Sequence, residues 1–389
     1  MANPFEDDAG PSGALDPAAN PFRPGMGLVP PALGGRDEPL RRAKVVVDRL
    51  SRRGPAPFVL YRGVRGVGKT ALLAYVRQQA TKRGILTAHV EADRDDTEVV
   101  NVRRSLLHEA APLLLDLDRD VASRLAAIDA SGGVPKLRPA VSAVAGMEAL
   151  IGDIATLAGA TGRPVLLTVD EVHEAEDVLL RPLLRAAHRA AQEAHPLGVL
   201  LSGLPSAAEH VFKEGQTYTE RLERVDLGLL DRAATAVALC GPFADHAGAE
   251  VDELVLDAVL DSSGGYPWFV QLWGAALWDA AASPDRIELP DARQAGVEVH
   301  DRVTAFFADR WSRVPSGRAT SLVTTLAEAG GDVEVGTLLD TLDLTHQAIS
   351  PARRELLDLG LCWAPSRGRL AFTVPGFASW IARTRPQDA

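Results

Sequence analysis

Cysteine and long apolar runs are scarce in this sequence, and each shortage excludes a class of protein. The only cysteines, Cys240 and Cys362, lie far apart and fit neither a disulfide framework nor a metal site. No apolar run approaches the roughly 18 residues that a membrane helix needs. The N-terminus, MANPFEDDAG, is acidic and lacks the basic and apolar stretches of a signal peptide. The expected location is therefore cytoplasmic.

Positive charge is also in short supply. The formal net charge is −11, which argues against a protein that coats nucleic acid over most of its surface but leaves room for a small basic patch. Arginine is abundant, whereas lysine occurs only at Lys44, Lys69, Lys82, Lys136 and Lys213. This skew and the alanine richness indicate a GC-rich, bacterial genome, and they make Lys69 stand out as a lysine kept for its chemistry.

Length and composition predict a globular protein of more than one domain. The chain has 389 residues, of which 46% are hydrophobic and 24% charged, and this length suits two or three domains. Residues 1–25 are dense in Pro, Gly, Ala and Asp and are predicted to be a disordered N-terminal arm. The tripeptide Asn-Pro-Phe occurs there twice, at residues 3–5 and 20–22. It is either a turn-forming step in a flexible arm or a docking motif for a partner.

Residues 26–230 are predicted to form an α/β domain, because short apolar runs alternate with helical segments. One helix is expected after Arg36 and another over residues 69–81. Buried strands are expected at residues 57–61, 84–93, 163–171, 196–203 and 223–229. The first two flank the helix at 69–81 and are expected to pair in parallel through this crossover. The predicted fold class is therefore α/β, with a doubly wound parallel sheet.

The remainder of the chain is predicted to be mainly helical. Residues 231–300 are expected to form a helical lid and linker, with a polar link over residues 283–296. Residues 301–389 are predicted to contain successive helices and then two short strands, which is the order of a winged helix-turn-helix. The second helix of that motif is expected at residues 335–342 and the third near Thr345.

One glycine-rich stretch predicts a nucleotide site. GVRGVGKT, residues 63–70, matches the phosphate-loop pattern G-x-x-x-x-G-K-[ST] in full, between an expected strand and an expected helix. Glycines let successive backbone N–H groups turn toward phosphate oxygens, and the helix N-terminus adds its positive end. Lys69 is expected to reach the β and γ phosphates of ATP. The predicted nucleotide-binding residues are Gly63, Val64, Arg65, Gly66, Val67, Gly68, Lys69, Thr70 and Ala71.

An acidic pair ends the strand expected at 163–171. It supplies the carboxylate that a phosphate loop needs on a neighbouring strand to hold the metal. Asp170 and the Thr70 hydroxyl are predicted to hold Mg²⁺, since Asp170 ends a strand where ligands bind in parallel sheets. Glu171 is predicted to polarise the attacking water as general base. An adjacent Asp-Glu pair indicates hydrolysis rather than binding alone. The plainer alternative is a solvated acidic pair at a strand end.

Three further residues are candidates for contacting the bound nucleotide. Ser202 near the end of the strand at 196–203 either senses the γ-phosphate or positions the water, or it simply belongs to a turn. Arg221 and Arg224 fall at the last strand, on the edge of the domain. Either is a candidate to reach the nucleotide of a neighbouring subunit, and a plain surface arginine is the alternative.

Together these residues resemble the AAA+ ATPases, and more narrowly the initiator-type branch that includes the origin-recognition ATPases. STAND signalling NTPases share the same marks. The resemblance covers nearly the whole chain and implies an AAA+ type P-loop sheet, a helical lid and a C-terminal winged helix. It implies a catalytic set of Lys69, Glu171, Ser202 and Arg221, with Arg221 in the place of the trans-acting arginine.

The resemblance also implies a pocket for the adenine base. The lead-in before the first helix packs near adenine in this family, which points to Pro31, Leu33 and Arg36. The lid segment at residues 263–268, SGGYPW, has no arginine where initiator ATPases usually carry one. Its Gly-Gly-x-Pro turn looks more like the lid of STAND-type NTPases, and this likeness implies that Pro267 lies against the nucleotide.

The C-terminal segment carries arginines that suit phosphate contacts. The third helix is expected to present Arg353 and Arg354, and the hairpin tip Arg367 and Arg369. Acidic side chains on or near the same helices oppose such a contact: Asp340, Asp343, Glu355 and Asp358. The segment is therefore expected either to contact duplex DNA or to dock a protein.

Two functions are consistent with these features. The first is an ATP-hydrolysing AAA+ type protein that couples its nucleotide state to oligomerisation and to binding of DNA or a partner. The second is a STAND-like signalling switch whose winged helix docks protein rather than DNA. A metabolic kinase is disfavoured by Glu171 and by the long helical lid.

Overall fold

The computed structural model describes residues 14–25, 27–92, 162–175, 177–207 and 222–384, with the short pieces 151–152, 154–156, 158–159 and residue 211. The chain divides into two compact units. We call one the α/β unit, Arg36–Gly63 with Lys69–Leu227, and the other the helical unit, Met1–Gly35 with Val64–Gly68 and Gly228–Ala389. Within the described residues, no helix is long and apolar enough to cross a membrane.

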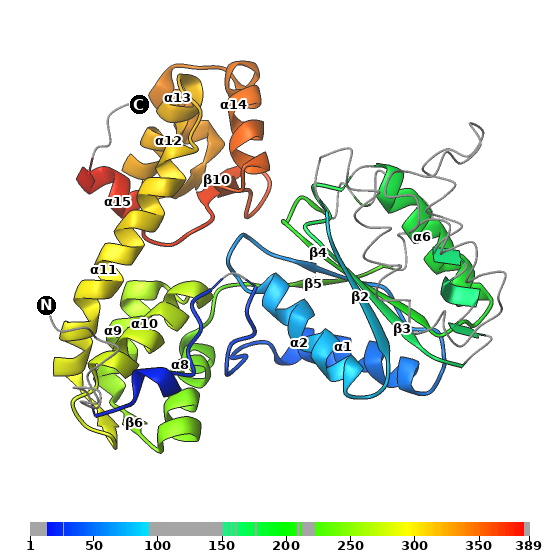
Figure 1. Cartoon of the computed structure of the whole chain (residues 1–389). Coiled ribbons are helices and arrows are strands. Elements are labelled where there is room, and N and C mark those ends of the chain that lie inside the picture. Colours follow the sequence, from blue (N-terminus) through cyan, green and yellow to red (C-terminus); the bar gives the residue numbers. More distant parts are fainter. Residues whose placement is uncertain are drawn as a thin grey trace, which may run out of the picture. The chain divides into compact units, whose positions relative to one another are not determined.

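The α/β unit is built on a parallel sheet, which confirms the predicted fold class. Its strands lie in the order β2-β3-β4-β1-β5. Their bounds are β1 Val59–Arg62, β2 Leu86–Glu91, β3 Val165–Asp170, β4 Leu197–Gly203 and β5 Glu223–Asp226. Helices α1 (Asp37–Ser51) and α2 (Lys69–Thr81) lie on one face of this sheet and α6 (Asp177–Gln192) on the other (Figure 1).

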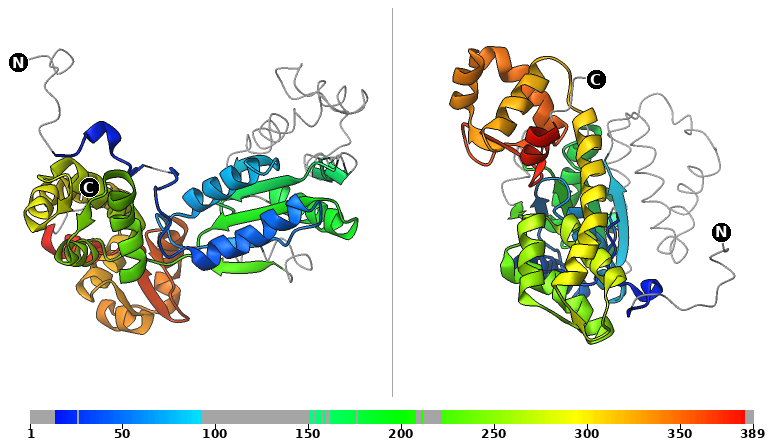
Figure 2. Two further views of the ribbon diagram at one scale, coloured as in Figure 1. Left: turned by 90° about the horizontal axis from the view of Figure 1, so that it is seen from below. Right: turned by 90° about the vertical axis from the view of Figure 1, so that its left-hand side faces the viewer.

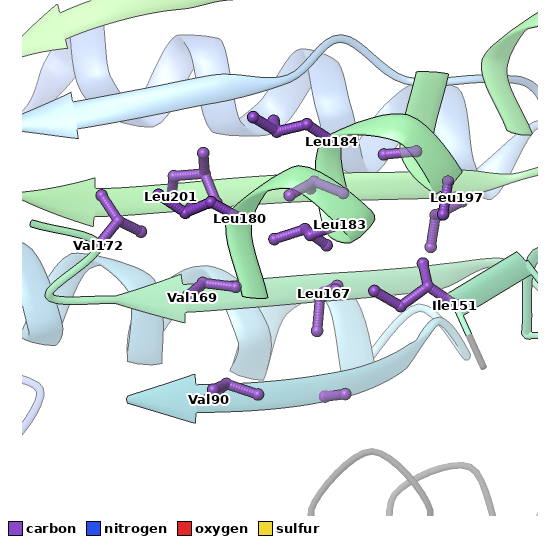
Figure 3. Packing of buried hydrophobic residues seen from close by; sticks show 14 of the residues in the cluster. Val90, Ile151, Leu167, Val169, Val172, Leu180, Leu183, Leu184, Leu197 and Leu201 are labelled. Atoms are coloured by element: carbon purple, nitrogen blue, oxygen red, sulfur yellow. The ribbon is translucent and has the colours of Figure 1, made fainter. Parts of the chain in front are cut away.

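Alternate residues of the strands face the two layers, as the two-residue period of a strand requires. Leu167 and Val169 of β3 and Leu201 of β4 point toward α6, where they meet its leucines (Figure 3). Leu180 and Leu183 of that helix have no exposed surface. Each such buried leucine contributes about 1.5–3 kcal/mol relative to an exposed one. This packing fixes α6 on the sheet and with it the ends of β3 and β4.

One expected strand pairing is wrong. The strands at the two ends of α2, β1 and β2, are parallel, but they do not pair with each other. β1 pairs with β4 and β5, whereas β2 pairs with β3. Two strands from later in the chain, β3 and β4, therefore lie between them. As a result, β4 lies between the strand before the phosphate loop and the strand that carries Asp170. The end of β4 can therefore contribute side chains to the site.

The helical unit begins with a helical bundle of α8 (Arg232–Ala247), α9 (Glu253–Ser263), α10 (Pro267–Ala280) and the first part of α11 (Leu289–Ser312), with a small pair of strands β6 (Glu250–Val251) and β7 (Arg286–Ile287). The prediction of a polar link over residues 283–296 is wrong for its second half. α11 starts at Leu289, with a reciprocal cap between Glu288 and Asp291 and a proline in its first turn. The predicted domain boundary at residue 300 therefore falls inside one continuous helix, which Figure 2 shows in yellow.

The prediction of disorder for residues 1–25 does not hold for residues 14–25. This segment forms a short 3₁₀ helix at Pro17–Ala19 and packs on α10. The Asn20 side chain donates to the Ala275 carbonyl at 3.1 Å, and the buried Phe22 ring contacts Phe243 at 5.2 Å between centroids. The Asn-Pro-Phe copy at 20–22 is thus bound by its own chain. The copy at 3–5 lies outside the described residues.

The C-terminal part of the helical unit contains α12 (Arg318–Glu328), β8 (Asp332–Glu334), α13 (Val335–Leu342), α14 (His346–Asp358), β9 (Cys362–Trp363), β10 (Arg369–Phe372) and α15 (Phe377–Thr384). Its strands form an antiparallel sheet in the order β8-β10-β9. The predicted helix at 335–342 and the helix start near Thr345 agree with α13 and α14. Thr345 is the N-cap of α14, and its hydroxyl accepts from the Ala348 amide.

Aromatic side chains join the two parts of the helical unit. Rings from α10, α11 and α15 contact one another in series, among them Phe269 with Phe307 at 5.9 Å and Phe307 with Phe377 at 5.5 Å between centroids. All six tryptophans of the chain lie between Trp268 and Trp380, in this unit. The two cysteines, Cys240 and Cys362, are free thiols.

Candidate nucleotide-binding site

The phosphate-loop sequence lies between a strand and a helix, as predicted. β1 ends at Arg62, and α2 begins at Lys69. The Gly63 amide donates to the Gly203 carbonyl at 3.2 Å, which ties the start of the loop to the end of β4. Lys69 is 4% exposed, and its ammonium donates to the Gly63 carbonyl at 3.1 Å. A buried lysine held at the mouth of this loop is suited to meet phosphate oxygens.

Two glycines of the loop have backbones that other residues rarely adopt. The φ angles are +79° at Gly66 and +90° at Gly68, in the region that favours glycine. Gly66 also meets a side chain of the helical unit, to which residues 64–68 belong. A Cβ atom at Gly66 would overlap the Tyr266 hydroxyl. That hydroxyl donates to the Arg65 carbonyl at 2.9 Å, so this contact needs a glycine.

The two predicted metal ligands lie together in the α/β unit. The Thr70 hydroxyl donates to Asp170 Oδ2 at 2.5 Å, and the Ser202 hydroxyl donates to Asp170 Oδ1. Asp170 is 2% exposed and Ser202 is fully buried. The strand order explains the arrangement, because β4 brings Ser202 between the loop after β1 and the end of β3. Ser202 is therefore positioned to orient the carboxylate of Asp170.

This oxygen-rich pair fits a magnesium ion. Mg²⁺ prefers hard oxygen ligands and is usually bound through one or two carboxylates together with substrate phosphates. The Thr70 hydroxyl and the Asp170 carboxylate are such ligands; they bond each other, and Thr70 directly follows Lys69 in the sequence. They are the residues that would hold the ion.

Glu171 follows Asp170 in a tight turn. Its φ is +51°, a left-handed conformation that costs a residue other than glycine about 1–3 kcal/mol. Backbone bonds hold the turn: Glu174 N donates to the Glu171 carbonyl at 2.8 Å, and Val172 N to the Ser202 carbonyl at 2.9 Å. The Glu171 side chain is 22% exposed. A strained, partly exposed carboxylate beside a buried one is a suitable position for a general base.

His173 was missed by the sequence analysis. Its Nδ1 lies 3.3 Å from Glu171 Oε2, and its Nε2 lies 3.3 Å from Glu174 Oε1. The imidazole is 6% exposed. The signal that was available is its place two residues after Glu171, because a turn that follows a strand brings such neighbours together.

The predicted base-pocket residues are distributed over both units. Arg36 is 6% exposed and precedes α1 as its N-cap residue, and burial lowers the pKa of its guanidinium. Leu33 is half-buried and Pro31 exposed, both in the helical unit. Pro267, half-buried, is the first residue of α10. Their contact with adenine stays a prediction.

Of the two candidate trans-acting arginines, the structure describes only Arg224. Arg221 lies outside the described residues. Arg224 is exposed on β5, the last strand of the sheet order. Neither residue is assigned a role by this geometry.

The C-terminal arginines have different surroundings. Arg369, at the start of β10, donates to Asp332 of β8 at 2.9 Å. Arg354 on α14 lies 3.8 Å from Asp358 and is 84% exposed. Arg353 is half-buried, and Arg367 is exposed in the turn between β9 and β10. The four therefore do not form one unpaired cationic face, since acidic neighbours lie beside two of them.

Comparison with known families agrees with this site. Residues 32–202 match the family described as AAA ATPase domain. Residues 304–381 match a domain of unknown function, DUF8462. No curated protein matches the chain in sequence.

Several solved structures have a similar fold. The Walker-type ATPase PABY2304 of Pyrococcus abyssi has a TM-score of 0.57 at 13% identity, over 92% of this chain and 100% of that one. The Orc1 protein of Aeropyrum pernix, in complex with DNA, has a TM-score of 0.48 at 18% identity, over 92% and 94%. The RuvB Holliday junction branch migration motor of Thermotoga maritima has a TM-score of 0.45 at 13% identity, over 94% of this chain and 100% of that one.

At these identities the likeness concerns the fold alone, and the first of the three is the one with a TM-score above 0.5. It agrees with the parallel sheet and its flanking helices. The family match covers the phosphate loop, Asp170, Glu171 and Ser202. With the strand order and the contacts of Lys69 and Asp170, it identifies residues 32–202 of this chain as an AAA ATPase domain.

Proposed function

We propose that this protein binds ATP with Mg²⁺ and hydrolyses it in the α/β unit. Lys69 binds the β and γ phosphates, Thr70 and Asp170 hold the metal, and Glu171 takes the proton from the attacking water. The ion would neutralise charge on the phosphates as the bond to the γ-phosphate breaks. The family match at residues 32–202 supports the ATPase activity.

The observation that carries this proposal is the bonding around Asp170. Its two oxygens accept hydrogen bonds from two hydroxyls, Thr70 on α2 and Ser202 on β4. A buried carboxylate without partners would be costly, and here its partners are groups that ATPases use at their metal site. Glu171, which begins the turn, is partly exposed. The separation of a buried Asp from a partly exposed Glu supports two different roles.

Replacing the proposed base tests the reaction. In Glu171→Gln the amide cannot take a proton, so ATP hydrolysis should slow by about 10²-fold or more, while ATP still binds. Steady-state hydrolysis and equilibrium binding of ATP with Mg²⁺ measure the two effects. Glu193→Gln, at an exposed residue after α6, is the matched control and should change neither. Hydrolysis at the normal rate in Glu171→Gln would contradict the proposal.

We further propose that the nucleotide state controls oligomerisation and the binding of DNA or a partner, with the C-terminal part acting as a winged helix. The helix and strand order from α12 to β10 supports that assignment. The alternative is a STAND-like switch whose winged helix docks protein. The Tyr266 contact with the Arg65 carbonyl favours this alternative, because it gives the phosphate loop a partner at the start of α10.

The dependence of the ATPase rate on protein concentration separates the two. An assembling protein completed by Arg221 of a neighbour should show a rate per subunit that rises with concentration, and further with duplex DNA. Loss of this rise in Arg221→Ala would support the assignment of the arginine. A slow ATPase rate that changes with neither protein concentration nor duplex DNA would support the STAND-like switch.

A further inference from the structure

We propose that Tyr266 is a positioning residue for phosphate binding: its hydroxyl fixes the peptide group between Arg65 and Gly66, so that the Gly66 N–H is available to a phosphate oxygen. This role rests on the proposed function, in which residues 63–70 bind the phosphates of ATP. Tyr266 lies 201 positions after Arg65 in the sequence. Neither the phosphate-loop pattern nor the acidic pair contains it.

The contact between Tyr266 and the loop has a defined donor and a defined acceptor. The phenol hydroxyl donates to the Arg65 carbonyl oxygen at 2.9 Å, and a carbonyl oxygen can only accept. Burial raises the pKa of Tyr266 to about 12, so the hydroxyl keeps its proton at neutral pH. Both residues belong to the helical unit.

This hydrogen bond also sets the direction of the next N–H group. The Arg65 carbonyl and the Gly66 N–H belong to one planar peptide group, and in a trans peptide the two point in opposite directions. A carbonyl held by Tyr266 therefore turns the Gly66 N–H away from that side chain. Within the described residues this N–H donates to no other group, and Gly66 is exposed. Because the N–H groups of such a loop bind phosphate oxygens, this one is available to ATP.

Arg65 and Gly66 are both held closely by the helical unit. The φ angle of Gly66 is +79°, and a Cβ atom there would overlap the Tyr266 hydroxyl. The Arg65 side chain packs beside Gly360, since a Cβ atom on that glycine would lie 3.1 Å from its Cδ and its Nε. Arg65 therefore meets the start of α10 through its carbonyl and the turn after α14 through its side chain.

The tyrosine is itself fixed by its surroundings. Tyr266 is 2% exposed, and its ring contacts that of Phe269 at 4.8 Å between centroids. At the N-cap of α10 its amide donates to the Ser263 carbonyl at 3.0 Å, and its carbonyl accepts from the Val270 amide at 3.0 Å. A donor that is fixed before ATP binds lowers the entropic cost of ordering the loop around the phosphates.

Removal of one oxygen atom tests this role. Tyr266→Phe keeps the ring and loses the donor, and one hydrogen bond corresponds to a roughly 2- to 10-fold change in an equilibrium constant. We expect Kd for ATP with Mg²⁺ to rise by this factor. At saturating ATP kcat should stay within about twofold, because Asp170 and Glu171 are unchanged.

Tyr75→Phe is the matched control for this substitution. Tyr75 is half-buried on α2, and its hydroxyl makes no hydrogen bond in the part of the chain that the structure describes. The control removes the same atom from the same type of side chain. It should leave Kd and kcat unchanged.

A tyrosine with a purely structural role would give a different result. Tyr266→Phe would then unfold at a lower temperature without nucleotide and lose kcat as the folded fraction falls, with Kd unchanged. That pattern would overturn the proposal.

Tripolyphosphate separates a phosphate effect from a change at the base through the neighbouring Pro267, because it carries phosphates without adenine. Its inhibition constant against ATP hydrolysis should rise in Tyr266→Phe by the same factor as Kd for ATP. An unchanged inhibition constant would overturn the role in phosphate binding.

Lys69→Ala distinguishes failure of this role from failure of the proposed function. If Lys69→Ala weakens ATP binding while Tyr266→Phe binds ATP normally, the role of Tyr266 is overturned and the site stands. Normal ATP binding in Lys69→Ala would overturn both. If Tyr266→Phe does not fold, Tyr266→Met serves as the variant without a hydroxyl.

Discussion

Buried polar side chains are arranged differently in the two units of this protein. Among the described residues of the α/β unit they are Arg36, Lys69, Thr168, Asp170 and Ser202, and three of these gather where β1, β3 and β4 end. In the helical unit the buried Arg310 of α11 instead joins distant backbone segments. It donates to the Gly360 carbonyl at 2.9 Å and to the Thr373 hydroxyl at 2.7 Å.

The difference shows how a buried charge can be interpreted. Lys69 and Arg310 are 4% and 6% exposed, so burial alone does not distinguish them. Arg310 also lies over the Phe306 ring at 5.3 Å, and its partners belong to the scaffold. The partners of Asp170, in contrast, are hydroxyls at the phosphate loop and at a neighbouring strand end. A buried carboxylate that accepts from hydroxyls of the phosphate-loop motif and of a neighbouring strand indicates a site. Arg310 instead bonds a carbonyl and a hydroxyl of the C-terminal scaffold, which indicates a structural role.

The largest expected effect is at Lys69. Lys69→Ala should weaken ATP binding by roughly 10²-fold, since a hydrogen bond to a charged group is worth about 1.5–3 kcal/mol. The unfolding temperature without nucleotide should change little. Isothermal titration with ATP and Mg²⁺ measures the binding. Lys82→Ala removes an equal charge from an exposed position and should bind ATP normally; equal loss in both variants would contradict a site at Lys69.

Arg310 should show the opposite behaviour. Arg310→Met removes both hydrogen bonds and should destabilise the helical unit by about 2–3 kcal/mol, with ATP affinity retained. Scanning calorimetry should show the corresponding transition at a lower temperature. Arg313→Met, which removes an exposed pair with Asp309 on the same helix, should cost under about 1 kcal/mol. Loss of ATP binding in Arg310→Met would break the distinction between the two cations.

The last effect is a dependence of the free energy of unfolding on alkaline pH, in which Cys362 and Tyr266 of the helical unit take part. Burial raises the pKa of the Cys362 thiol from 9.0 to about 12 and that of the Tyr266 hydroxyl from 10.0 to about 12. Because the folded pKa exceeds the unfolded one, the free energy of unfolding should fall as pH rises from 9.0 toward 12. Denaturant unfolding across this range measures it. In Cys362→Ala the free energy of unfolding should fall less steeply as pH rises above 9.0. An unchanged slope would contradict the assignment of this part of the pH dependence to the Cys362 thiol.

Local sequence patterns were enough to predict the elements that carry the chemistry. The phosphate loop and its flanking strand and helix depend on neighbouring residues, and the predicted helix at 69–81 agrees with α2. The acidic pair was likewise predictable, because Asp170 ends a continuous apolar run. The role of Ser202 was left open by the sequence. Its bond to Asp170 depends on the order of three strands, which no local pattern contains.

Other features depend on contacts between residues far apart in the chain. The segment at 14–25 looks disordered by composition, yet Asn20 and Phe22 find partners on α8 and α10 more than two hundred residues away. The start of α11 was missed because Pro290 was interpreted as part of a linker, although proline is also common in the first turn of a helix. His173 was missed because its contacts with Glu171 and with the Leu204 amide form only in the folded chain.

All six tryptophans lie in the helical unit. Intrinsic tryptophan fluorescence can therefore follow this unit without an added label. The α/β unit has no tryptophan, so excitation that is selective for indole reports on the helical unit alone. Trp268, two residues after Tyr266 at the start of α10, is part of the aromatic series of that unit. A change in indole emission when ATP is added would thus record a response of the helical unit. Unchanged indole emission during ATP hydrolysis would show that the helical unit does not respond to the nucleotide.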